Sequence, residues 1–317
     1  MADTSMNPST AGPVLTIDDL RGDRRRMRIE SASGLLMLSA ALTSVVISAL
    51  IVFSLVSEAW TFISQVEWKT LWSDGWFPRR GLYDVKTIFV GSLLVTAVAM
   101  IVAAPLGLGA AVYLSEYAGP RTRRILKPVL EILAGIPSVV LGFFALTWLS
   151  PELVQRFNGE ATQFNLAAAG LGVGVLTIPL VASISEDAMR SVPNSLREAS
   201  YGMGARKVTT VVRVVIPAAV SGLVAAFIVA VSRAIGETMV VAIAAGGTGA
   251  SLFTTDVFRP GQTMTAAMTS LAAGTDQVRG AGLTFQALFF VGLLLFIITL
   301  LLNVIGDRFV QRVRQRY

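Results

Sequence analysis

The stretch SVPNSLREASYGMGARKVTTVVRVVIPAAVSG, residues 191–222, separates two long apolar runs. Pro193 suits the first turn of a helix, with Ser191 as its cap. Gly202 or Gly204 is suited to end that helix in the left-handed conformation. A second amphipathic piece follows, with one face formed by Val208, Val211, Val212 and Val215. The stretch therefore predicts a helix–turn–helix between two apolar segments, with its charged residues near the tip.

Composition places this stretch in a membrane protein. Of the 317 residues, 54% are hydrophobic and 15% are charged, whereas soluble domains carry about 25% charged residues. The chain has no cysteine and no histidine. Thiol nucleophiles, imidazole bases and the commonest metal ligands are therefore excluded, and we expect no enzyme active site in this chain.

Six apolar segments are long enough to cross a hydrocarbon core of about 30 Å. A secretory signal is the competing interpretation of the first one, but its apolar run is long and a polar tail precedes it. Because lipid offers no hydrogen bonds to the backbone, we expect an all-α polytopic membrane protein with six transmembrane helices. The expected spans are 35–56, 87–114, 125–149, 165–184, 218–245 and 285–305.

The lysines and arginines predict the orientation. Most of the 26 lie in the N-terminal tail, in alternate loops and in the C-terminal tail, so the positive-inside rule places both termini in the cytoplasm. We expect a cytoplasmic tail over 1–34, a permease domain over 35–306 and a second cytoplasmic tail over 307–317. Within the permease domain, 186–217 is expected inside and 57–86 outside. Tryptophans in the outer loop favour an interfacial anchor, with a docking surface as the alternative: Trp60, Trp68, Trp72 and Trp76.

Proline and glycine within the spans predict breaks in the helices at Gly135, Pro137 and Pro179. Freed backbone groups are tolerated in a membrane where a cavity or neighbouring helices satisfy them, and transport pathways are often built in this way. Ordinary kinking or close packing of helices is the alternative.

The spacing EASYGMG…VVIP resembles the EAA loop of the permeases of ABC importers. In that pattern Glu-Ala-Ala is followed after three residues by Gly, and after nine more by Ile-x-Leu-Pro. Glu198, Ala199 and Ser200 match the first three positions, Gly204 the glycine, and Val214 to Pro217 the end. Ser200 departs from the second alanine. The resemblance implies that this loop couples to an ATPase, with the contact residues Arg197, Glu198, Ala199, Gly204, Arg206 and Pro217.

Further stretches, SRAIGETM and GIPSVVLG, are similar to the phosphate permeases of the Pst system, and the C-terminal run is closer to PstC than to PstA. The resemblance implies a type I ABC importer permease with a MetI-like fold in a bacterial inner membrane. It also implies a PstA-like second permease, two PstB-like ATPases and a PstS-like binding protein. ATP and magnesium would be held by the ATPases, and this chain would bind no cofactor; it contains no phosphate-loop motif.

Arg233 and Glu237 interrupt the apolar run of the fifth span. Residues four apart share a helix face, so the two side chains can pair and lessen the cost of burial. The resemblance implies a role in transport, in which Arg233 holds the anion and Glu237 keeps it from being held too tightly. A packing ion pair is the alternative. Lys127 and Glu131, near the cytoplasmic start of the third span, are weaker candidates, and pairing at the membrane interface is sufficient to explain them.

Two other functions remain open at this stage. One is an ABC permease for another oxyanion, because one arginine does not distinguish among tetrahedral anions. The other is an ion-coupled secondary transporter, which leaves the Glu198–Pro217 pattern without a role.

Overall fold

The computed structural model describes residues 24–246, 251–274 and 282–313. The chain divides into two units, residues 1–54 and 55–317. In the first unit the described residues form most of helix α2 (Arg24–Gln65), and its large apolar side chains from Ile29 to Phe53 are mostly exposed. A helical segment that is apolar all round is suited to lipid or to the interior of a helix bundle.

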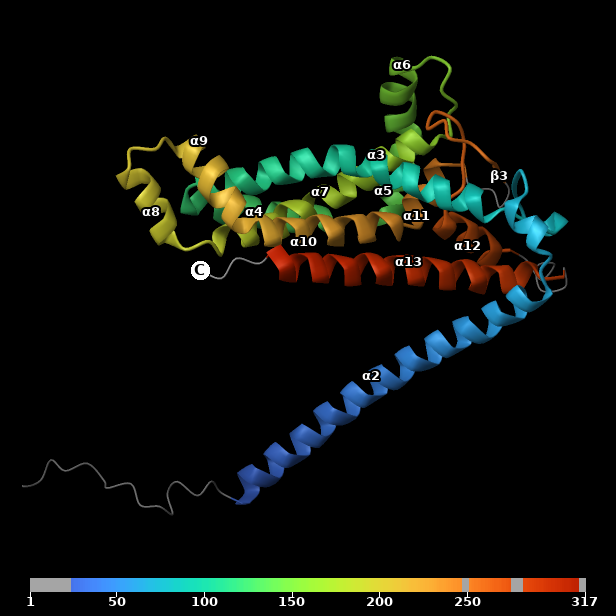
Figure 1. Ribbon diagram of the computed structural model, residues 1–317, viewed down its shortest axis with the longest axis horizontal. Coiled ribbons are helices and arrows are strands. Elements are labelled where there is room, and N and C mark those ends of the chain that lie inside the picture. Colours follow the sequence, from blue (N-terminus) through green and yellow to red (C-terminus); the bar gives the residue numbers. More distant parts are fainter. Residues whose placement is uncertain (1–23, 247–250, 275–281, 314–317) are drawn as a thin grey trace, which may run out of the picture. The chain divides into compact units, whose positions relative to one another are not determined.

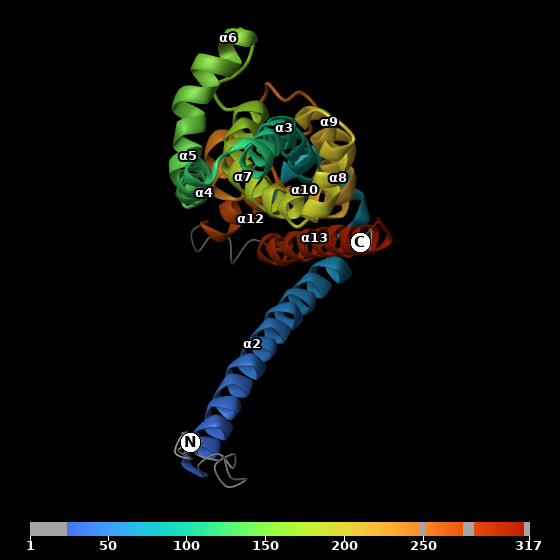
Figure 2. The same ribbon diagram turned by 90° about the vertical axis from the view of Figure 1, so that its left-hand side faces the viewer.

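The second unit is a bundle of long helices (Figures 1 and 2). Helix α3 (Val85–Val112) packs along α7 (Leu166–Arg190), and α10 (Ile216–Ile235) packs on both of them and on α13 (Thr284–Val313). Glycines allow the close approach of α3 and α7: a Cβ on Gly107 would lie 2.7 Å from that of Val181. Six helices in the described chain have the length and composition to cross a membrane, as expected.

Short elements occupy the two ends of this bundle (Figure 1). At one end lie α8 (Asn194–Gly202) and α9 (Lys207–Thr210), with the π-helical turn η5 (Val211–Val215) leading into α10. At the other end β1 (Gly75–Phe77) pairs antiparallel with β2 (Leu82–Tyr83) and with β3 (Ser251–Leu252). The 3-10 turns η1 (Trp68–Trp72) and η2 (Pro78–Arg80) flank β1.

The third predicted span is wrong in its bounds. Helix α4 (Pro120–Ala134) ends at Gly135, and a new helical run begins after Pro137: α5 (Ser138–Phe144), η4 (Ala145–Val154) and α6 (Gln155–Phe157). The proline disfavours the helical conformation of the residue before it. The predicted break at Gly135 and Pro137 is therefore present, and the membrane-length segment is Ser138–Phe157.

Helix α7 continues through Pro179, so the predicted break there is absent. The fifth predicted span is divided instead, because α10 stops at Ile235 and α11 (Met239–Ala244) starts after three non-helical residues. A further helix, α12 (Met264–Ala272), had no counterpart among the predicted spans. The sequence shows the apolar residues of these segments but not the positions at which one helix ends and the next begins.

Two predicted loops are partly helical. Helix α2 extends to Gln65, well into the expected outer loop, and α13 extends to Val313 in the expected C-terminal tail. The tryptophans of the outer loop also differ among themselves. Trp76 is fully buried against Tyr83 in the hydrophobic core, so it is no interfacial anchor, whereas the other three are exposed.

Candidate functional site: the α8–α9 loop and the Arg233 helix end

The predicted helix–turn–helix is present as α8 and α9. Pro193 stands at the N-cap of α8, and Gly204 has a φ of +78°, the left-handed conformation that glycine adopts without strain. Ser191 is not the cap: it ends α7, and its hydroxyl donates to the carbonyl of Ala188. Val211 and Val215 are both buried, and Val215 packs in one hydrophobic cluster with Ala111 of α3 and Met189 of α7, which attaches the loop to the bundle.

Ser200 has a structural role in this loop. Its hydroxyl lies 2.8 Å from that of Thr210, and both side chains are buried. This hydrogen bond joins α8 to α9 across the turn. The serine at the second alanine position therefore holds the two helices of the loop together.

Arg197 points into the protein rather than outward. Its Nη2 and Nε donate to the two carboxylate oxygens of Glu116, at 2.8 and 3.3 Å, in the π-helical turn η3 (Tyr113–Tyr117) that follows α3. It also donates to the backbone carbonyls of Met189 and Val192, at 2.9 and 2.6 Å. Only 14% of the arginine side chain and 4% of the glutamate side chain are exposed. Arg197 thus fastens α8 to the ends of α3 and α7.

The outward face of the loop carries a different set of side chains. Met203 is 85% exposed at the tip, and Glu198, Ala199, Arg206 and Val208 are also exposed. An acidic and a basic side chain around exposed apolar groups form a surface suited to a protein partner. We call these five residues the loop face.

Arg233 and Glu237 form an ion pair at the end of α10. Arg233 Nη1 lies 2.7 Å from Glu237 Oε2, and the two side chains are 48% and 3% exposed. They are not on one continuous helix, because α10 ends at Ile235. The backbone carbonyl of Glu237 accepts a hydrogen bond from Thr265 Oγ1 of α12 at 2.6 Å. Glu237 is therefore fixed in the core, whereas half of the Arg233 side chain is exposed.

The structure brings the break at Gly135–Pro137 close to the break after α10. Ile136 and Leu141 pack in the same hydrophobic cluster as Ala234 and Val240. Helix α5 also contacts α11, since a Cβ on Gly142 would lie 3.2 Å from the carbonyl of Met239. Pro179 is buried within α7 and joins neither break.

The sequence reasoning named Lys127 but missed the ionic cluster to which it belongs. Glu186 of α7 is fully buried, and its carboxylate lies 2.6 Å from Arg123 Nη2 and 2.9 Å from Lys127 Nζ, both on α4. Lys127 also pairs with Asp187 at 2.7 Å. Burial alone lowers the pKa of Lys127, but the hydrogen bonds and charges of the two carboxylates outweigh it and raise the pKa above its usual value.

Glu131, the other weak candidate, is exposed and pairs with none of these groups. The only sequence signal for the cluster is an acidic pair at the end of an apolar run. Its cationic partners lie 59 and more residues away. Across the described part of the chain, no three acidic side chains gather in a way that could hold a metal ion.

Comparisons with known proteins identify the relatives of this chain. A family model described as "Binding-protein-dependent transport system inner membrane component" matches residues 103–317. The "Probable ABC transporter permease protein YqgH" of Bacillus subtilis is 37% identical over 238 residues, 73% of each chain. The "Phosphate transport system permease protein PstC" of Mesorhizobium japonicum is 30% identical over 296 residues, 88% of this chain and 89% of that one.

Two solved structures share the fold. A bacterial ABC transporter involved in the import of the acidic polysaccharide alginate has a chain that superposes with a TM-score of 0.62 at 11% identity, over 92% of this chain and 100% of that one. A chain of the inward-facing MetNI methionine ABC transporter gives 0.52 at 22% identity, over 73% and 96%.

Proposed function

Because the chain belongs to the family of binding-protein-dependent transport system inner membrane components, we propose that it is the permease subunit of an ATP-driven importer of inorganic phosphate. Family membership confirms the predicted resemblance to ABC-importer permeases and the predicted fold. The choice of phosphate is supported by relatives that are named phosphate transport system permease proteins. In this proposal the chain forms half of the translocation pathway and hydrolyses nothing itself.

The observation that carries the proposal is the α8–α9 loop between two membrane-length helices. The loop face is exposed, and behind it Arg197 fastens α8 to the ends of α3 and α7. A force applied to this face by a soluble subunit is passed to the bundle through these hydrogen bonds. A PstB-like ATPase is the partner that fits, with ATP and magnesium bound there rather than here.

The remaining partners follow from the same assignment. A PstA-like permease would complete the pathway with a second α8–α9 loop for a second ATPase, and a PstS-like protein would deliver phosphate from outside. With the basic loops inside, the protein lies in a bacterial inner membrane with both termini in the cytoplasm.

Within the pathway, Arg233 is proposed to hold the anion. Its guanidinium is always charged and presents a fork of donors that matches phosphate oxygens. About half of its side chain is exposed, and it lies at the end of α10, next to the non-helical residues that separate α10 from α11. Glu237 neutralises it when no anion is present, so the phosphate is bound weakly enough to leave.

Uptake of radiolabelled phosphate by proteoliposomes containing the whole transporter tests this proposal. We expect ATP-dependent uptake by the wild type and a loss of at least tenfold, about 1.4 kcal/mol or more, in Arg233→Gln. Arg156→Gln is the matched control, because Arg156 also pairs with a glutamate four residues away but is 74% exposed at the surface. It should transport normally.

A second variant tests the loop. Glu198→Lys reverses a charge on the loop face and should release the ATPase from the purified complex, whereas Glu160→Lys, an exposed residue outside the loop, should not. Uptake driven by an ion gradient without ATP would reject the importer in favour of a secondary transporter. Preference for sulfate over phosphate in competition would reassign the substrate to another oxyanion.

A further inference from the structure

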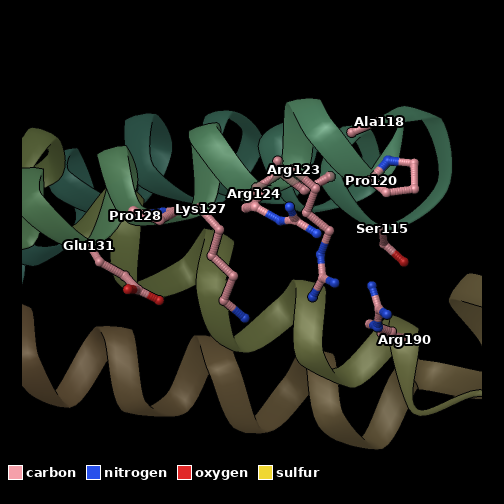
Figure 3. A pocket seen from close by; sticks show the side chains of 10 residues that line it. Ser115, Ala118, Pro120, Arg123, Arg124, Lys127, Pro128, Glu131 and Arg190 are labelled. Atoms are coloured by element: carbon pink, nitrogen blue, oxygen red, sulfur yellow. The ribbon is translucent and has the colours of Figure 1, made fainter.

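A hollow of about 500 Å³ opens between α4, the turn η3 that follows α3, and the end of α7. Figure 3 shows side chains of α4 pointing toward α7, and Arg190 at the end of α7 pointing into the same space. Four cations line it, Arg123, Arg124, Lys127 and Arg190, against the single carboxylate of Glu131. This hollow lies apart from Arg233 and plays no part in the function proposed above.

The four cations differ in how they are held. Arg123 and Lys127 are fixed by the buried carboxylate of Glu186, at 2.6 and 2.9 Å, and about a quarter of each side chain remains exposed. Arg124 and Arg190 are exposed, and among the residues that the structure describes they form no ion pair. Two positioned cations therefore stand beside two unpaired ones around one space.

Helix α4 adds to this arrangement because it is amphipathic. Arg123, Arg124 and Lys127 lie on one face, and the opposite face exposes Ile125, Val129 and Ile132. The rim of the hollow is the N-terminal end of α4, where helix dipoles favour an anion. A helix with these two faces is suited to the boundary between a membrane and water.

We propose that this hollow binds a phosphate group. Arginine matches phosphate oxygens with two parallel hydrogen bonds, and two arginines free of ion pairs can each supply them. Basic pockets between membrane helices hold lipid headgroups in this way. The group can come from an anionic phospholipid beside α4 or from inorganic phosphate in the surrounding water, and both present the same oxygens to the arginines.

The test uses the whole transporter complex in phosphatidylcholine nanodiscs, titrated with short-chain phosphatidylglycerol in one arm and with inorganic phosphate in the other. Arg124→Gln with Arg190→Gln should weaken binding of the occupant roughly tenfold or more, the effect of losing a hydrogen bond to a charged group. The matched control is Arg121→Gln with Arg213→Gln, which removes two exposed arginines that do not line the hollow. The phosphate arm is repeated with Arg233→Gln, so that binding at the proposed pathway is counted separately.

Each result decides the proposal. Binding of phosphatidylglycerol that depends on Arg124 and Arg190 identifies a lipid site, and binding of inorganic phosphate with the same dependence identifies a site for the free ion. Absence of both in the wild type, or equal weakening by the control pair, overturns the proposal. Arg124→Lys with Arg190→Lys keeps the charges but removes the paired donors, so its affinity should lie between those of the wild type and the glutamine pair; a thermal midpoint equal to that of the wild type in both pairs separates loss of a ligand contact from loss of folding.

Discussion

The hydrogen bonds between Arg197 and Glu116 should carry motion from the α8–α9 loop to the bundle. The perturbation is a double-mutant cycle of Arg197→Gln and Glu116→Gln. Replacing Arg197 removes both bonds to the carboxylate and both bonds to backbone carbonyls. It leaves Glu116, 4% exposed, with the hydroxyl of Ser115 as its one remaining side-chain donor among the described residues. Breaking a buried pair in this way costs about 3–5 kcal/mol.

Glu116→Gln should reduce the free energy of unfolding by less than Arg197→Gln does. In Glu116→Gln the arginine keeps its bonds to Met189 and Val192, so we expect a loss of about 1.5–3 kcal/mol. Since the two side chains contact each other directly, the double variant should lose about 1–3 kcal/mol less than the sum of the two. The thermal midpoint of the assembled complex in detergent measures this, and Arg197→Gln should lower it on the order of 6 °C or more.

The functional readout separates transmission from docking. If Arg197 works behind the loop face, then Arg197→Gln should keep the ATPase bound and still hydrolysing ATP, while phosphate uptake per ATP falls. If Arg197→Gln instead releases the ATPase as Glu198→Lys is expected to do, Arg197 contacts the partner directly and the reasoning from its burial is refuted. Strict additivity of the two single variants would refute it independently.

Four further results are expected. Gly204→Ala places a methyl group in the left-handed conformation and should destabilise the complex by about 1–2 kcal/mol in thermal denaturation. Gly107→Ala should disturb the α3–α7 contact and lower the thermal midpoint by several degrees, whereas Gly109→Ala, with open space around it, should not. Glu186→Gln should cost about 3–5 kcal/mol, because two cations of α4 lose a buried partner; an unchanged melting temperature would contradict this. Because the pKa of Lys127 is raised in the folded protein, its contribution to the free energy of unfolding is complete below its ordinary pKa and is lost only as the pH rises through the raised pKa. The difference in melting temperature between Lys127→Met and wild type should therefore be constant from about pH 6 to 9.

Local chemistry made the loop predictable. Pro193 starts α8 and Gly204, with a φ of +78°, ends it, because each residue restricts or permits the conformation of its own backbone. The turn between α8 and α9 could therefore be predicted from the sequence. The break at Gly135 and Pro137 was predictable for the same reason. Pro179 shows the limit, because whether a proline ends a helix or is carried through it depends on the helices packed around it.

Tertiary contacts were not predictable in this way. Arg197 and Glu116 are 81 residues apart, and the resemblance to the EAA loop led us to expect the arginine on the partner surface near the tip of the loop. Hydropathy likewise placed one span across Gly236, where the apolar run continues but the helix ends. The membrane-length runs were visible in composition, whereas their breaks and their ionic contacts required the fold.

Three buried carboxylates pair with cations at junctions between helices, Glu116 and Glu237 with one cation each and Glu186 with two, and the exposure of these cations differs. Glu116, Glu186 and Glu237 are 4%, 1% and 3% exposed, so each carboxylate is fixed in the core. Arg197 is 14% exposed and donates to two backbone carbonyls besides the carboxylate of Glu116, so it holds α8 rigidly against the bundle. Arg233 is 48% exposed, so water already competes with its glutamate. If Arg233 lies in the pathway as proposed, an anion can compete for its exposed side, at the cost of leaving the buried carboxylate of Glu237 with a weaker partner. Drawing Arg197 from Glu116 would also break two hydrogen bonds to backbone carbonyls that no anion replaces.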